Sequence, residues 1–94
     1  MDVGVGRARA AVAATLKASS QVARGPVRLE IDAVSIVQAF DRDYVIVSVM
    51  TGAPRFGRGV LYLTGAQPVE HDVESAAALA ALKAVNRVLA KVAT

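Results

Sequence analysis

The stretch Tyr44-Val45-Ile46-Val47-Ser48-Val49-Met50 decides how the rest of the chain can be arranged. It consists mainly of β-branched and large apolar residues, with charged residues only before it and Gly52 shortly after it. A run of this kind predicts a strand that is apolar on both faces. We therefore expect it to be the central strand of a small sheet.

The segment before this strand predicts its first neighbour. Residues Val27 to Ala33 alternate apolar and polar side chains in strict period two, which is typical of a strand with one buried face. From Val34 onward the alternation is out of phase, which predicts a bulge or bend near Ala33. A short polar turn, residues 41–43, precedes the central strand, so we expect these two strands to form an antiparallel hairpin.

A third strand is predicted over residues 59–64, which are again apolar on both sides. It follows a loop rich in glycine and proline, residues 51–59, and Pro68 discourages the strand from continuing. Residues Met1 to Gly6 contain two glycines and little to pack, so we expect a flexible N-terminal end there.

Two helices are predicted, one at each end of the chain. Residues 7–23 are helix formers stopped by Gly25-Pro26, with a narrow apolar stripe. Residues 73–92 carry an apolar arc of about 120°, with Asp72 as the N-cap. The arc consists of Ala78, Ala81, Leu82, Val85, Val88, Leu89 and Val92, and we expect Lys83, Arg87 and Lys91 on the opposite side.

This order predicts one α+β domain over residues 1–94, a two-layer sandwich with a three-stranded antiparallel sheet and two helices on one face (α-β-β-β-α). Two helices cover only one face, which leaves an apolar sheet face open. We therefore expect a homodimer joined through the sheet face or an edge strand. The alternative is that β-propensity alone explains the exposed Val and Ile. The residues expected to contribute are Tyr44, Ile46, Val47, Val49, Leu61 and Leu63.

Composition excludes several kinds of chemistry. The chain has no cysteine, so a disulfide, a thiolate nucleophile and a thiolate metal ligand are ruled out. No apolar run approaches the ~18 residues of a membrane span. The first ten residues lack the apolar core of a signal peptide. We expect a cytoplasmic protein that does not contact a membrane.

The net charge of +3 is compatible with an anionic partner, and two basic features stand out. Arg55-Phe56-Gly57-Arg58-Gly59 could stack on bases and contact phosphates, although a solvated hairpin loop has the same composition. The basic row of the last helix could contact phosphates, or could simply be its water-facing side. The candidate contacts to nucleic acid or another anion are Arg55, Arg58, Lys83, Arg87 and Lys91.

The order of helix, three strands and helix is similar to that of double-stranded RNA-binding domains. Gly59 before a strand and the alanine-rich final helix also fit. In that family a cluster of lysines at the start of the second helix contacts phosphates. Here the corresponding position reads Glu70-His71-Asp72-Val73-Glu74, which would repel them. The resemblance is in topology only, and no residue roles are carried over.

No catalytic set is evident. His71 is the only histidine and lies between Glu70 and Asp72, but Asp72 is already explained as a helix cap. There is no histidine pair at metal spacing, no phosphate loop and no dinucleotide fingerprint. The serines lack a neighbouring base. We expect neither an enzyme nor a cofactor or metal site, and we rank an enzyme built around His71 last.

The expected function is a small non-enzymatic binding or assembly module, of a regulatory kind, that self-associates through its sheet and contacts a protein or small molecule. The alternative is a nucleic-acid-binding protein that uses the Arg/Gly loop and the basic helix face.

Overall fold

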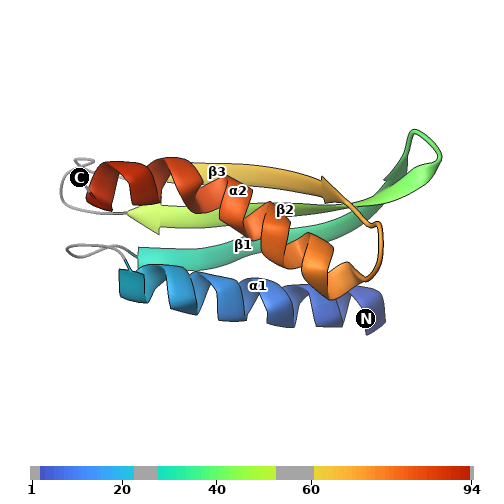
Figure 1. Cartoon of the computed structure of the whole chain (residues 1–94), viewed down its shortest axis with the longest axis horizontal. Helices are drawn as coiled ribbons and strands as arrows, with labels where there is room; N and C mark the ends of the chain where they lie inside the picture. Colours follow the sequence, from blue (N-terminus) through green and yellow to red (C-terminus); the bar gives the residue numbers. More distant parts are fainter. Residues whose placement is uncertain (1–2, 23–27, 53–60, 94) are drawn as a thin grey trace.

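The computed structural model describes residues 3–22, 28–52 and 61–93, with side chains of the helices described over 4–20 and 73–86. Along the chain lie α1 (Val3–Val22), β1 (Arg28–Ala39), β2 (Arg42–Gly52), β3 (Leu61–Pro68) and α2 (Val73–Ala93) (Figure 1). The predicted order α-β-β-β-α is confirmed.

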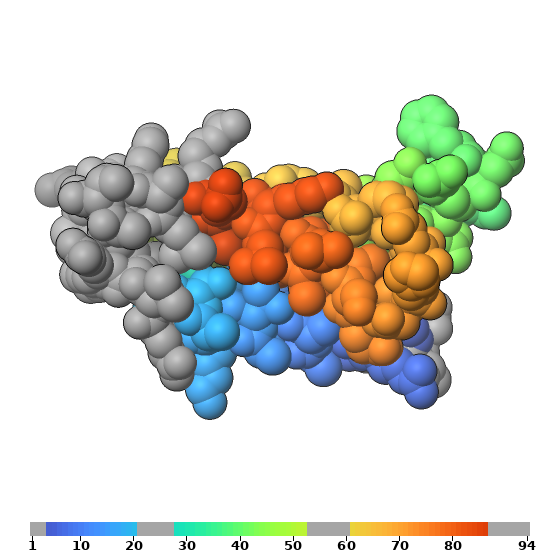
Figure 2. Space-filling view, in the orientation of Figure 1, coloured from blue at the N-terminus to red at the C-terminus, as the bar shows by residue number. Residues whose placement is uncertain are grey.

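The three strands form one antiparallel sheet in the order β1-β2-β3, so β2 is the central strand as predicted. Both helices pack against one face of this sheet, α1 over β1 and α2 over β2 and β3, and they also contact each other. Figure 2 shows them side by side, α1 in blue and α2 in orange to red. The fold is therefore the predicted two-layer α+β sandwich.

Burial alternates residue by residue along β2. Val45, Val47, Val49 and Thr51 are buried beneath the helices, whereas Tyr44 and every second residue after it are only partly buried. This period of two is inherent in a strand, because successive side chains point to opposite faces. The helices therefore cover one phase of β2 and leave the other uncovered.

A bulge in β1 lies where the alternation changes phase. Ile31 pairs with Val49 and Ala33 with Ser48, so Asp32 is the extra residue on its strand. The bulge keeps apolar residues on the helix-facing side both before it, at Ile31, and after it, at Val34. The predicted irregularity near Ala33 is confirmed.

The β1–β2 turn differs from the prediction of a polar turn at residues 41–43. Ala39 pairs with Arg42, so the loop is only Phe40 and Asp41, with φ of 53° and 62°. A two-residue hairpin of type I′ requires positive φ at both positions, because only then does its twist match that of the strands. Neither residue is a glycine or asparagine, which is why the turn was misplaced.

Helix α1 begins at Val3, four residues earlier than predicted, and includes Gly4 and Gly6. Glycine lowers helix propensity, but packing of one helix face supplies most helical stability in proteins. The buried stripe is as narrow as expected and consists of Ala8, Val12, Leu16 and Ser19.

Helix α2 is rotated relative to the prediction. Its buried side consists mostly of alanine, namely Ala76, Ala77, Ala80, Ala81, Ala84 and Val85, whereas Leu82 of the predicted arc is 44% exposed. The side chains of the later arc residues lie outside the described residues. Small side chains let the helix approach the sheet closely, so residue size decided which side is buried. No helix in the described part of the chain is both long enough and apolar enough to cross a membrane.

Candidate self-association surface

No described element covers the face of the sheet that points away from the helices. Its residues alternate with the buried ones along each strand. The uncharged central part of this face consists of eleven residues, three from β1, four from β2 and four from β3. We call this set the outer sheet face: Ala33, Ser35, Val37, Tyr44, Ile46, Ser48, Met50, Tyr62, Thr64, Ala66 and Pro68.

Charged side chains of the same sheet face adjoin these residues: Glu30 pairs with Met50 and Arg28 with Gly52 at one end, and Arg42 pairs with Ala39 at the other. The central row of the outer sheet face, Tyr44 to Met50, is partly buried by its own neighbours, whereas Tyr62 at the β3 side is 62% exposed. Arg28 Nε lies 3.1 Å from Glu30 Oε1, and both side chains are well exposed. An uncharged surface bounded by charged groups is typical of an interface.

The size of this face can be estimated from strand geometry. Residues on one face are ~6.8 Å apart along a strand and strands are ~4.8 Å apart, so each residue covers on the order of 33 Å². Eleven residues then span roughly 350 Å² of flat sheet. Patches of this size are often functional on monomers, but a standard interface takes ~800 Å² from each partner.

The structure separates the six residues predicted for self-association. Tyr44 and Ile46 lie on the outer sheet face. Val47 and Val49 are 0% exposed beneath the helices, so their prediction as contacts was wrong. Leu61 and Leu63 belong to the helix-facing phase; Leu63 packs on the core and Leu61 is 45% exposed. A strand that is apolar on both faces cannot reveal which phase the helices will cover.

Sequence reasoning missed two large residues of this face, Met50 and Tyr62. They are register partners at the end of β2 and β3 farthest from the β1–β2 turn. Tyr62 lies between Leu61 and Leu63 in the apolar third strand. Successive side chains of a strand point to opposite faces, so the sequence could have placed Tyr62 on the face opposite the two leucines.

Both sheet edges are poorly suited to pairing with another strand. On β3, Pro68 has no N–H to donate, and Lys83 Nζ donates a long hydrogen bond of 3.4 Å to Ala66 O. On β1, the bulge at Asp32 interrupts the ladder. Bulges, prolines and lysines protect natural edge strands against such pairing. Of the two dimer arrangements predicted, the sheet face is therefore favoured.

The basic residues do not form a described patch. Arg55 and Arg58 lie outside the described residues, as do the side chains of Arg87 and Lys91. Lys83 is exposed but reaches the β3 edge instead of the side opposite the core. That side carries Leu79, 47% exposed, with Leu82 and Asn86, so the predicted place of the basic row was wrong for Lys83.

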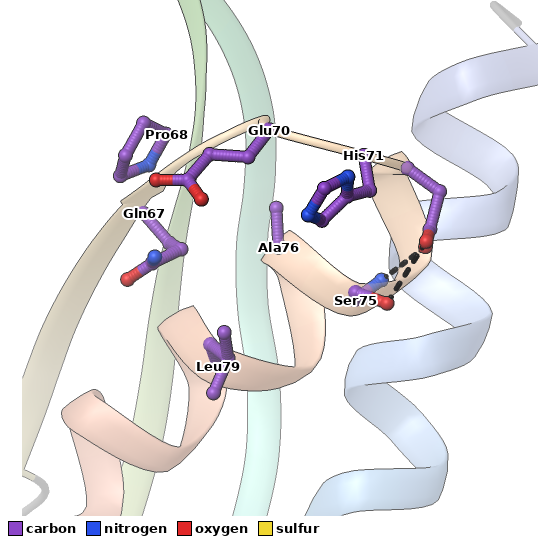
Figure 3. A pocket seen from close by; sticks show the side chains of 8 residues that line it. Gln67, Pro68, Glu70, His71, Ser75, Ala76 and Leu79 are labelled. Atoms are coloured by element: carbon purple, nitrogen blue, oxygen red, sulfur yellow. Dashed lines mark hydrogen bonds between the residues drawn. The ribbon is translucent and has the colours of Figure 1, made fainter.

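A small cavity of about 60 Å³ lies beside His71 at the start of α2. Figure 3 shows the imidazole of His71 beside Ala76, with the carboxylate of Glu70 on the side of Gln67 and Pro68. The cavity is far smaller than the ~300–1,000 Å³ of sites that hold a drug-sized ligand. Its lining residues are Gln67, Pro68, Glu70, His71, Asp72, Ser75, Ala76 and Leu79. Among the described residues, no group of three or more His, Asp or Glu could hold a metal ion.

The carboxylate of Asp72 is engaged as the predicted N-cap of α2. Oδ1 accepts a hydrogen bond from Ser75 N at 2.6 Å and Oδ2 accepts one from Ser75 Oγ at 3.0 Å (Figure 3, dashed lines). These bonds, first the backbone one and then the side-chain one, lower the pKa of Asp72 below its ordinary value, and nearby His71 adds to this. Asp72 therefore has a structural role.

The start of α2 is acidic, with Glu70 and Asp72 exposed and Glu74 in the first turn. A nucleic-acid backbone approaching this end of the helix would be repelled. Comparison of the chain with protein-family models, curated protein sequences and solved structures found no match. The function is therefore inferred from the geometry of the chain itself.

Proposed function

We propose that this chain is a small non-enzymatic assembly module that forms a homodimer through its outer sheet face. The observation that supports this most directly is the uncharged surface that extends over all three strands on the side away from the helices. An antiparallel sheet can leave one face in water when that face is polar. Here the uncovered face is largely apolar, and exposed apolar patches of this kind usually mark an interaction site.

A two-fold axis would place the two sheets face to face, with the helices on the outside of a four-layer dimer. Aligned sheets pack about 10 Å apart with their strands turned by roughly 30°. Ile46 and Ser48 of each central strand would then lie near the middle of the interface. The contact is isologous, so it closes at two copies and does not propagate.

The area of the face predicts a weak dimer. Two faces of roughly 350 Å² bury about 700 Å², which at ~25 cal/mol per Å² gives at most about 17 kcal/mol. Association costs on the order of 4–15 kcal/mol, and Ser35, Ser48 and Thr64 reduce the apolar share. The free energy that remains is at most about 13 kcal/mol, and the ~8 kcal/mol of a micromolar Kd lies within this limit.

The experiment is a dilution series by sedimentation equilibrium, which measures the mass of the 9.7 kDa chain at each concentration. We expect the mass to rise to twice the monomer value with increasing concentration. The variant Ser35→Arg places a charge on the outer sheet face at an exposed position of the monomer, so the chain should fold and remain monomeric.

Leu82→Arg is the matched control, because it introduces the same side chain at an exposed apolar position of α2. We expect it to leave the dimer intact. A wild-type chain that stays monomeric throughout the series would overturn the proposal. So would a dimer that Leu82→Arg dissociates while Ser35→Arg does not, because the interface would then lie on the helices.

A second arm of the experiment adds short mixed-sequence DNA or RNA at low salt. No change of mass is expected, since the start of α2 is acidic. An increase that disappears with added salt would support the nucleic-acid alternative and contradict an assembly module without such a ligand.

A further inference from the structure

Phe40 occupies a backbone conformation that is unfavourable for its side chain. It has φ of 53° at the first position of the β1–β2 turn, and its side chain is 87% exposed. For a bulky residue, positive φ is a genuine outlier, whereas asparagine or glycine adopts it readily. The exposed ring gains no burial within its own chain that would offset this strain, which points to a role outside it.

The turn extends past the helical layer. In Figures 1 and 2 the β1–β2 hairpin, coloured green, projects from one end of the body beyond both helices. The ring of Phe40 lies 6.4 Å from that of Tyr44, at 75°, in an edge-to-face contact. Tyr44 belongs to the outer sheet face and pairs with Val37, which is 38% exposed. Phe40 therefore continues the outer sheet face beyond the body.

The flat outer faces alone fall short of a stable interface. Two faces bury about 700 Å², whereas specific interfaces bury at least ~1,200 Å². An exposed aromatic ring is the kind of side chain that contributes most binding free energy in interfaces. The hairpin tip is continuous with the outer sheet face and can supply the missing contact area.

We infer that Phe40 anchors the second copy of this chain, packing over the far end of its sheet at the partner's Met50 and the partner's Tyr62. The inference rests on the proposed sheet-to-sheet dimer and adds the relative direction of the strands in its two sheets. Each hairpin tip would reach across the partner, so the strands of the two sheets run in opposite directions.

Charge favours this direction over the other one. If the strands of both sheets ran the same way, the two tips would meet, and each carries Asp41, Arg42 and Asp43, with a net charge of −1. Like charges side by side oppose association. In the opposite orientation the tip instead approaches the end of the partner that carries the Arg28–Glu30 ion pair, which has no net charge.

The decisive variant is Phe40→Asn, because asparagine suits positive φ. It should raise the dimer Kd by about tenfold or more, the loss typical of an interface anchor. In the monomeric Ser35→Arg background it should instead raise the urea midpoint of unfolding, since strain is relieved. If Phe40 had only a structural role, Phe40→Asn would change the urea midpoint and leave the dimer Kd unchanged. Phe40→Trp, which keeps an aromatic ring, should keep the wild-type Kd within about threefold.

The position of the anchor is tested by a double-mutant cycle with Tyr62→Ser. In one copy Phe40 and Tyr62 lie at opposite ends of β2, about ten residues or ~30 Å apart, so they cannot couple directly. Across the dimer they would touch, and the two effects on Kd should be less than multiplicative. Multiplicative effects would overturn the placement.

The outcomes separate this inference from the proposed function. A wild-type chain that is monomeric at every concentration overturns both. A wild-type dimer that Ser35→Arg dissociates, but whose Kd is unchanged by Phe40→Asn, keeps the sheet-face dimer and overturns the anchor.

Discussion

Gly65 of β3 lies directly against the backbone of Ala80 in α2. A Cβ atom on Gly65 would overlap the carbonyl oxygen of Ala80 and come within 2.9 Å of Ala84 N. The obstacle is helix backbone, which cannot move aside as a flexible side chain can. This contact sets how closely α2 approaches the sheet.

Gly65→Ala should therefore destabilise the fold by roughly 3 kcal/mol, the upper end of overpacking effects. Urea unfolding in the monomeric Ser35→Arg background would measure it without a contribution from dimerisation. Thr64→Ala, on the exposed side of the same strand, is the control and should change stability by less than about 0.5 kcal/mol. An unchanged urea midpoint for Gly65→Ala would mean that α2 lies farther from β3.

The orientation of α2 predicts that a substitution at the small residue Ala80 destabilises the fold more than truncation of the larger Leu82. Ala80 is 0% exposed and Leu82 is 44% exposed. Enlarging the alanine, Ala80→Leu, should destabilise the fold by roughly 2 to 3 kcal/mol because no space is available. Leu82→Ala should cost less than about 1 kcal/mol. Thermal unfolding of the two variants measures both effects. A larger loss of stability for Leu82→Ala than for Ala80→Leu would mean that Leu82 is buried, as the predicted apolar arc of α2 requires.

Thr51 offers a stabilising substitution. Its side chain is 1% exposed at the helix-facing end of β2, and Oγ1 has no hydrogen-bond partner among the described residues. Valine has nearly the same shape and removes the unpaired hydroxyl, so Thr51→Val should stabilise by about 1 kcal/mol. Thr64→Val on the exposed face is the control and should give no comparable gain. Loss of stability in urea unfolding of Thr51→Val would show that the hydroxyl is paired.

The cap of α2 predicts a pH-dependent contribution to stability. The pKa of Asp72 is lowered from 3.8 by its two hydrogen bonds with Ser75 and by His71. A lowered folded pKa means that the carboxylate stabilises the fold above the unfolded value, and that this contribution is lost as pH falls through the folded pKa. Asp72→Ala should lower the midpoint of thermal unfolding at pH 7, and the difference from wild type should shrink below pH 3.8.

Asp72→Asn is the matched control, because asparagine caps a helix as well as aspartate but does not titrate in this range. Its unfolding midpoint relative to Asp72→Ala should stay constant between pH 7 and pH 3. A constant difference between wild type and Asp72→Ala over the same range would contradict the charge contribution.

The strands were predictable because their pattern is local. The alternation of residues 27–33 and its change of phase indicated β1 and its bulge, and the short connection indicated the hairpin. The turn at Phe40 and Asp41 was misplaced because it lacks the asparagine and glycine by which such turns are recognised.

The candidate surface was only half predictable. Tyr44 and Ile46 were expected at the interface, but so were Val47 and Val49, which the helices bury. Neighbouring residues of β2 are equally apolar, so the strand itself does not say which phase faces the helices. The covered phase depends on contacts between elements far apart in the chain.

The sequence by itself determined the element order, the antiparallel pairing and the N-cap of α2, because these follow from periodicity, short connections and the single polar residue Asp72. Only the tertiary structure decided which side of α2 is buried. Hydrophobicity favoured Leu82, but the close approach at Gly65 leaves room for Ala80 and Ala84 alone. Steric fit between α2 and β3 thus outweighed the hydrophobic gain from burying the larger side chain.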